Sequence, residues 1–215
     1  MREQISDEML DSLRNSLKTK MSGYRLAHTF GVEEMARRIG EIYCPEKVNM
    51  LRAAALLHDI TKELSTAEHK EIFSRHGMEM SREMEEAYPT QHAASAALEI
   101  PDRYPEFSDG EIVDAVRFHT TGRADMSLCE KIIYLSDYID STRTYSDCIL
   151  LREMFWGADP ENMTQEERLL HLDKVVLKSF ELTIDDLRER GRPISRETAQ
   201  ARDFLQKQIQ INEAK

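Results

Sequence analysis

A histidine and an aspartate are adjacent at His58 and Asp59, where the apolar stretch AAALLHDITKEL (residues 53–64) turns polar. Burying an unpaired ionised group costs several kcal/mol, so this pair requires a partner in the folded chain. A hydrogen-bonded neighbour, an opposite charge or a metal ion can serve, and divalent Fe, Mn, Co and Zn accept mixed imidazole and carboxylate ligands. The dipeptide alone fits a metal site and a buried His–Asp hydrogen bond equally well.

A second acidic residue occurs in comparable surroundings. Asp137 lies near the end of EKIIYLSDYID (residues 130–140), another strongly apolar pattern, so a carboxylate again stands where burial is expected. His28 lies early in a further predicted helix. With His58 and Asp59 these residues make a four-ligand set for a divalent metal, which would leave coordination positions open for water and a substrate oxygen.

Two other histidines, His92 and His119, have two functional interpretations. They can be ligands of a second metal, which Asp59 could bridge, or they can contact phosphates and act as general acids for the departing phosphate. We favour one tightly held metal with both histidines on the phosphates. The remaining histidines are expected to be ordinary surface or hydrogen-bonded core residues: His69, His76 and His171.

Three cationic side chains stand close in sequence to the proposed ligands. Lys62 lies one turn after the His–Asp pair, Arg25 one turn before the first ligand, and Arg143 just beyond the last. Guanidinium groups suit bidentate phosphate contacts. Because the formal net charge is −11, an anionic substrate needs such a local cluster. The same net charge argues against a general nucleic-acid binder.

Almost every segment repeats its apolar residues at the helical period, and strictly alternating β-branched runs are missing, so we expect an all-α protein. Ser6 or Asp7 should cap the first helix and Gly23 should end it. Helical patterns cover residues 5–21, 24–43, 45–60, 64–76, 80–100, 109–119, 126–141, 145–156, 164–183 and 195–212. Breaks are expected at Gly77, Pro101, Pro105, 120–125, 157–164 and 190–193.

The chain of 215 residues has no long linker of Ser, Gly and Pro, which predicts a single domain, residues 1–215, with a C-terminal helical extension over about 160–215. No run approaches the roughly 18 apolar residues of a membrane span, and the polar N-terminus lacks a signal region, so we expect a cytoplasmic protein without membrane contacts. Three cysteines without paired spacing predict reduced thiols rather than disulfides.

Several longer segments of the sequence resemble one known family. YRLAHTFGV, AAALLHDITKE and FHTTGRADMSLCEKIIYLSDYID are similar to the HD-domain metal-dependent phosphohydrolases, and most closely to the bacterial symmetrical diadenosine tetraphosphatase branch, the YqeK-like family. The resemblance covers about residues 20–145, the core of the expected HD-domain helical bundle, and is weaker over 192–205. The chain departs from the family pattern at QHAASAA (91–97), where glycine is usual, and at Asp140-Ser141, where Glu-Pro is usual.

The resemblance implies roles for particular residues. A divalent metal, commonly iron in the family, with Mn, Co or Zn as alternatives, would be held by His28, His58, Asp59 and Asp137. The nucleotide would be contacted by Arg25, Lys62, His92, His119, Thr120, Asp125 and Arg143. The catalytic set would be Asp59, Lys62, His92 and His119.

The predicted function is therefore a metal-dependent hydrolase that cleaves diadenosine tetraphosphate symmetrically to two ADP. Its partner would be a small-molecule nucleotide, and a homodimer is left open. One alternative is an HD phosphohydrolase acting on a nucleoside monophosphate, a nucleoside triphosphate or a cyclic nucleotide. Another is a non-catalytic sensor that binds metal and nucleotide.

Overall fold

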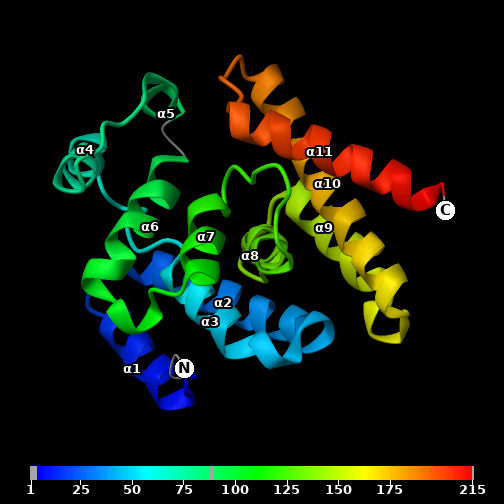
Figure 1. Ribbon diagram of the computed structural model, residues 1–215, viewed down its shortest axis with the longest axis horizontal. Helices are drawn as coiled ribbons and strands as arrows, with labels where there is room; N and C mark the ends of the chain where they lie inside the picture. Colours follow the sequence, from blue (N-terminus) through cyan, green and yellow to red (C-terminus); the bar gives the residue numbers. More distant parts are fainter. Residues whose placement is uncertain (1–3, 88–89, 215) are drawn as a thin grey trace.

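The computed structural model describes residues 4–87 and 90–214, and all regular structure within these ranges is helical. The all-α prediction is confirmed. The helices are α1 (Asp7–Leu17), α2 (Gly23–Tyr43), α3 (Val48–Leu57), α4 (Thr66–Arg75), α5 (Arg82–Glu86), α6 (Gln91–Arg103), α7 (Gly110–Phe118), α8 (Leu128–Ile139), α9 (Ser146–Gly157), α10 (Gln165–Glu189) and α11 (Arg196–Glu213), with short 3₁₀ turns η1 (Pro45–Lys47), η3 (Pro105–Phe107) and η4 (Pro160–Asn162) (Figure 1).

Side-chain caps set the starts of the first two helices. Ser6 caps α1, and its hydroxyl accepts a hydrogen bond from the Met9 amide. Of the two expected caps, Ser6 and Asp7, the structure thus has the first. Gly23 was expected to end α1, and this was wrong: α1 ends at Leu17 and Gly23 begins α2, because the Ser22 hydroxyl accepts from the Arg25 amide. A Ser before a helix satisfies one of its free N–H groups, and this outweighs the breaking tendency of the glycine.

The helix expected over residues 80–100 is instead two helices, α5 and α6, and positions 88–89 of that prediction lie outside the described residues. The break expected at Pro101 was also wrong, because α6 continues through it to Arg103. A proline in the last turn removes a single backbone hydrogen bond, which a buried helix tolerates. Helix α10 likewise runs to Glu189 rather than 183.

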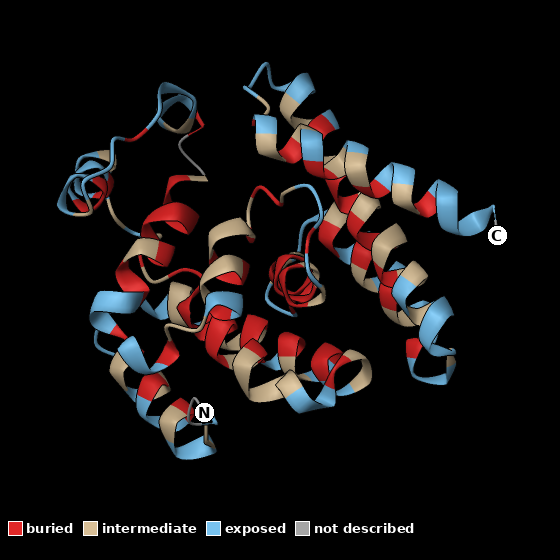
Figure 2. Cartoon of the chain, in the orientation of Figure 1, coloured by how far each residue is buried: buried red, intermediate tan, exposed pale blue. Residues whose placement is uncertain are grey.

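Helix α8 lies at the centre of the molecule. It packs against α2, α7, α9 and α10, and in Figure 2 it is seen end-on as a buried core surrounded by helices whose outer faces are exposed. Ile132, Ile133, Leu135 and Ile139 are all fully buried. A helix that is apolar on all sides must be enclosed. Asp137, on the same helix, is therefore carried into the interior.

The C-terminal helices α10 and α11 pack on each other, and α10 also covers α8 and α9. Phe180 of α10 lies against Tyr134 of α8, with ring centroids 4.6 Å apart. One cluster of buried apolar side chains runs from Leu10 in α1 to Ile209 in α11. This shared core supports the proposal that the chain forms one domain.

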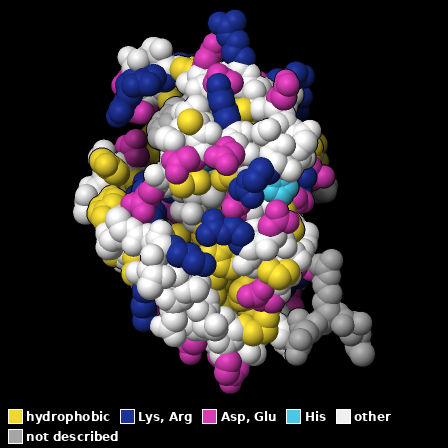
Figure 3. Space-filling model, turned by 90° about the vertical axis from the view of Figure 1, so that its left-hand side faces the viewer, with side chains coloured by type: hydrophobic (Ala, Val, Ile, Leu, Met, Phe, Trp, Pro, Cys, Tyr) yellow, Lys and Arg dark blue, Asp and Glu magenta, His cyan; other side chains and the backbone are white. Residues whose placement is uncertain are grey.

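The surface carries both signs of charge. On the face shown in Figure 3, Lys and Arg side chains are interspersed with Asp and Glu, and apolar side chains gather in patches between them. Among the helices of residues 4–87 and 90–214, none has the length and apolar character needed to cross a membrane.

Candidate metal centre

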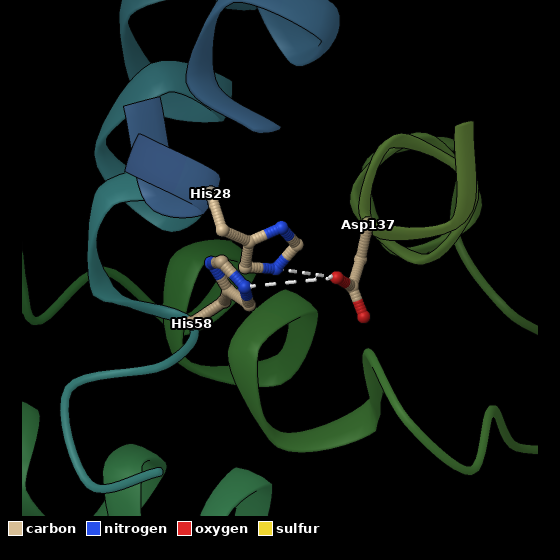
Figure 4. Close-up of side chains that lie close together, drawn as sticks. All are labelled: His28, His58 and Asp137. Atoms are coloured by element: carbon tan, nitrogen blue, oxygen red, sulfur yellow. Dashed lines mark ion pairs between the residues drawn. The ribbon is translucent and has the colours of Figure 1, made fainter. Parts of the chain in front are cut away.

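Three helices, α2, α3 and α8, bring the proposed ligands together. His28 lies on α2 and Asp137 on α8, while α3 ends at Leu57, so that His58 caps it and Asp59 begins the following turn. Figure 4 shows the His28 and His58 rings directed at the Asp137 carboxylate. The end of α3 explains how two adjacent residues can both face inward, since the chain no longer follows the helical 100° step there.

Three of these side chains form a compact donor set. His28 Nε2 lies 2.9 Å and His58 Nε2 3.9 Å from Asp137 Oδ1, and one potential ligand atom from each residue lies within 4.8 Å of the others. His58 Nδ1 is 2.6 Å from the Ala55 carbonyl oxygen, to which it donates, so its Nε2 carries the free lone pair. A second-shell bond of this kind fixes a ligating imidazole.

Asp59 completes the predicted set and extends it. Its Oδ2 lies 3.3 Å from His58 Nε2 and 3.7 Å from His28 Nε2. Its Oδ1 faces the other way, 3.1 Å from His92 Nε2 and 3.8 Å from His119 Nε2. Accordingly, His58, Asp59 and His119 form a second group of atoms with metal-ligand spacing.

Three buried atoms of this cluster make no hydrogen bond of good geometry, and their nearest polar neighbours are other members of the cluster. They are His28 Nε2, His58 Nε2 and Asp59 Oδ1. Buried polar atoms are almost always paired in folded proteins, so each such atom calls for a ligand. Two imidazole nitrogens and carboxylate oxygens suit a borderline divalent metal. The residues present therefore fit a metal ion, and their ligation of it stays a prediction.

The electrostatics of the cluster keep both carboxylates ionised. Burial alone would raise the pKa of Asp137, but the charge of Arg143 and the nearby His28 ring hold it well below its usual range. The pKa of Asp59 is likewise lowered, because His58 and His92 outweigh the effect of burial. Ionised carboxylates are the form that binds a cation.

His28 carries the opposite shift. Burial works to lower the pKa of His28, but the nearby Asp137 and Asp140 carboxylates prevail and raise it to about 9. In the absence of a metal the protein thus stabilises a positive charge at this ring. A divalent cation at the same place would displace that proton and supply the positive charge instead.

Lys62, His92 and His119 form a second group beside the first. Lys62 Nζ lies 3.2 Å from His92 Nδ1 and 3.3 Å from its Nε2, and His92 Nε2 lies 3.0 Å from His119 Nε2. His119 Nδ1 donates to the Val116 carbonyl at 2.7 Å. Burial lowers the pKa of Lys62 and of both histidines. The imidazoles are therefore neutral, and His92 can present an Nε2–H toward a bound group.

Two arginines bind the two carboxylates. Arg25 donates to Asp59 Oδ2, and Arg143 Nη2 donates to Asp137 Oδ1 at 2.5 Å. The charge of Asp137 raises the pKa of Arg143. Both guanidiniums have further N–H groups, so each can hold its carboxylate and a phosphate oxygen together.

The remaining predicted contacts, Thr120 and Asp125, differ in position. Thr120 follows His119 directly, and its buried hydroxyl has no hydrogen-bond partner. Asp125 is exposed, has a positive φ of 57°, and lines a different hollow with Lys131. In the part of the chain that the structure describes, no contact joins Asp125 to the metal centre.

Asp140 and Thr142 contact His28 and were not predicted as site residues. Asp140 is fully buried, with Oδ2 3.3 Å from His28 Nδ1, and Thr142 Oγ1 lies 3.4 Å from the same nitrogen. A Cβ on Gly31 would lie 2.8 Å from Asp140 Oδ1, so the glycine permits this approach. The combination of a mid-helix glycine and an acid just past Asp137 is the signal that could have revealed them.

The departure from the family pattern at residues 91–97 has no structural cost. QHAASAA (91–97) lies within α6, whose backbone is helical there. Among the described residues, the only non-glycine positions with positive φ are Asp125 and Asp159. Alanine therefore fits at 93, 94, 96 and 97 without strain.

The family model of the HD domain matches residues 25–142, a span that includes every proposed ligand. The chain belongs to the HD-domain family. Because the match covers more than half of the chain, the predicted family is confirmed. Family and geometry together indicate a divalent-metal site in this HD protein.

Curated relatives point to one kind of activity. This HD protein is 27% identical over 182 residues to the symmetrical bis(5'-nucleosyl)-tetraphosphatase of Bacillus subtilis (strain 168), covering 85% of this chain and 89% of that protein. It is 31% identical over 131 residues to the protein of the same name from Halalkalibacterium halodurans, covering 60% of this chain and 67% of the other.

A solved structure supports the fold. A predicted HD superfamily hydrolase involved in NAD metabolism from Clostridium acetobutylicum is similar with a TM-score of 0.79 and 31% identity. The similarity covers 92% of this chain and 97% of that chain. The similarity thus extends beyond the 118 residues that the HD-domain model matches.

Proposed function

We propose that this protein is a metal-dependent hydrolase that cleaves diadenosine tetraphosphate symmetrically into two ADP. The observation that carries the proposal is the set of buried, poorly hydrogen-bonded atoms on His28, His58 and Asp59, which lies among three cationic side chains. The first feature fits a metal and the second fits a polyphosphate. The names of the curated relatives support the substrate.

We further propose iron as the metal, held by His28, His58, Asp59 and Asp137, with Mn, Co or Zn as alternatives. When bound, a divalent metal would lower the pKa of a water molecule and polarise a phosphoryl oxygen. Imidazole and carboxylate ligands do not by themselves discriminate among these ions. A cytoplasmic location stays a prediction, and a homodimer remains open.

In this mechanism the chain's own cations bind and align the phosphates. Arg25 and Arg143 reach from the two carboxylates toward phosphate oxygens, and Lys62 Nζ neutralises charge on their far side. Phosphoryl transfer depends mainly on positioning and electrostatic stabilisation, so this cluster supplies much of the rate enhancement.

His92 and His119 complete the phosphate site. Lys62 Nζ, 3.2 Å from His92 Nδ1, holds the His92 ring in place, so that its Nε2–H donates to an oxygen of the departing ADP beside the neutral His119. The net reaction consumes one water and breaks the bond between the second and third phosphates. Each product is then ADP.

A second candidate is a hydrolase acting on NAD. The structural relative from Clostridium acetobutylicum is described as involved in NAD metabolism, and NAD also consists of two nucleosides joined through a phosphoanhydride. The same residues could bind its two phosphates. The two candidates differ in their products, since hydrolysis of the NAD pyrophosphate would give AMP and nicotinamide mononucleotide.

The test is product analysis with reduced protein supplied with iron or manganese. Diadenosine tetraphosphate and NAD are incubated separately, and the products are resolved by ion-exchange chromatography. ADP as the sole product of the first substrate supports the proposal. ATP plus AMP would contradict symmetrical cleavage, and turnover of NAD alone would favour the second candidate.

A further inference from the structure

Two exposed tyrosines on different elements lie close in sequence to residues of the metal centre. Tyr24 is 78% and Tyr145 68% exposed, the two highest values among the large hydrophobic side chains of the described residues. Single exposed apolar side chains are common and need no explanation. These two differ from the rest because each lies one or two residues in sequence from an arginine that binds a carboxylate of the centre.

Tyr24 is connected to the centre through α2 and Arg25. It precedes His28 by four residues, so the two side chains lie on the same side of the helix. The Arg25 guanidinium carbon lies 5.9 Å from the centroid of the Tyr24 ring, and the same guanidinium binds Asp59. A phosphate on Arg25 would thus have the ring beside it.

Tyr145 lies on the turn between α8 and α9. It caps α9, two residues beyond Arg143, which binds Asp137. The turn is held in place because Arg152 donates to the Ile139 and Arg143 carbonyls, both at 2.8 Å. The exposed ring therefore projects from an anchored backbone.

We propose that Tyr24 and Tyr145 form an aromatic rim on which a nucleobase of the substrate stacks. The inference rests on the proposed function, because it assumes a substrate that joins nucleosides through phosphates. Every base offers a π face to an aromatic ring, so stacking is strong but tolerant of sequence. The rim thus selects nucleotides over inorganic polyphosphates and discriminates weakly among bases.

The test replaces each ring by an aliphatic side chain in the full-length, metal-loaded protein. The variants are Tyr24→Leu, Tyr145→Leu and the double variant, with Tyr→Phe at each position as the conservative change. Leu150→Ala, at another exposed side chain of α9, is the matched control. KM and kcat are measured for diadenosine tetraphosphate, together with inhibition by ADP and by inorganic tripolyphosphate.

Each Tyr→Leu change should raise KM by about five- to 150-fold, the range expected for loss of one stacked base, with kcat retained. Inhibition by ADP should weaken by a similar factor, while inhibition by tripolyphosphate, which has no base, should stay the same. The Phe variants and Leu150→Ala should behave like the parent.

The outcomes separate this inference from the proposed function. Unchanged KM in the Leu variants of a parent that makes ADP would overturn the rim and leave the proposed function intact. Equal weakening of ADP and tripolyphosphate inhibition would also overturn it, because it would mean a general distortion of the site. A parent without activity on diadenosine tetraphosphate would overturn both.

Discussion

Two buried clusters of charge lie on α2 and α3, and they differ in how completely their atoms are paired. Glu33 is buried, and both of its oxygens accept hydrogen bonds: Oε1 from Arg14 Nη2 at 2.5 Å and Arg52 Nε at 3.1 Å, Oε2 from Arg14 Nε at 2.8 Å. Five residues earlier on α2, the buried His28 Nε2 makes no hydrogen bond of good geometry, and neither do His58 Nε2 and Asp59 Oδ1 beyond α3.

The difference distinguishes structural charge from functional charge. A buried carboxylate whose oxygens are bound by arginines needs nothing further, so the Glu33 cluster serves to join α1, α2 and α3. A buried cluster whose nitrogen and oxygen atoms are poorly hydrogen-bonded has an unfavourable desolvation free energy. Binding of a ligand offsets it. The comparison assigns opposite consequences to matched substitutions in the two clusters.

The largest effect is expected from Asp59→Asn. The amide keeps the size of the side chain but lacks the charge that binds the metal and faces His92. We expect kcat for diadenosine tetraphosphate to fall by about 10³-fold or more, since both cation binding and charge balance are lost. Steady-state kinetics with circular dichroism as a folding control would check this. A folded variant with parental kcat would refute the role of Asp59.

Glu33→Gln should show the reverse pattern. Leaving Arg14 and Arg52 without their carboxylate should cost about 2–3 kcal/mol of unfolding free energy, less than a fully buried pair because Arg14 is partly exposed. Activity of the folded variant should stay within about twofold of the parent. Urea unfolding monitored by circular dichroism measures the first value. Lost activity at full stability would remove the distinction between the clusters.

Asp140→Asn should have an intermediate effect. The variant loses the carboxylate that faces His28 Nδ1, and loss of such an outer partner typically weakens metal affinity by about 10–100-fold. Thr142→Val removes the longer contact to the same nitrogen and should weaken affinity less. Metal titration under a competing chelator compares the two. Equal affinity of Asp140→Asn and the parent would show that Asp140 does not position His28.

The smallest effect concerns His69, a buried histidine that is paired, with Nδ1 2.8 Å from Ser95 Oγ. Burial lowers the pKa of His69 in the folded protein. The neutral ring is thus favoured by folding, and the stability present above the ordinary value of about 6.5 declines as pH falls below it. One such group contributes at most about 1.4 kcal/mol per pH unit.

Replacing this side chain isolates its contribution. In His69→Gln the decline of melting temperature between pH 7 and 5 should be shallower than in the parent, while metal content stays the same. Parallel pH profiles in the two proteins would show that His69 does not couple stability to pH.

Much of the fold followed from local patterns. The helical period and the absence of alternating runs predicted the all-α class, and capping residues such as Ser6 followed from their chemistry. The errors arose where tertiary packing overrode local preference. Pro101 is tolerated because it falls in the last turn of a packed helix, and Gly23 begins a helix because the preceding Ser22 caps it.

The site was predictable to the extent that acids and imidazoles stood in apolar surroundings. His58, Asp59 and Asp137 were singled out in this way. The family resemblance then grouped them with His28 as one predicted ligand set. Contacts that depend on spatial approach were not predictable. Asp140 reaches His28 only because Gly31 lets α2 come close, a relation between residues more than 100 positions apart in the sequence.

The most direct test of the central claim is the metal content of the purified protein, measured by mass spectrometry after reconstitution with iron under reducing conditions. We expect about one tightly bound ion per chain in the parent and in Glu33→Gln, and a large loss of it in Asp59→Asn. The same samples should make ADP from diadenosine tetraphosphate in proportion to their metal. Asp59→Asn with full metal content and full activity would contradict the account.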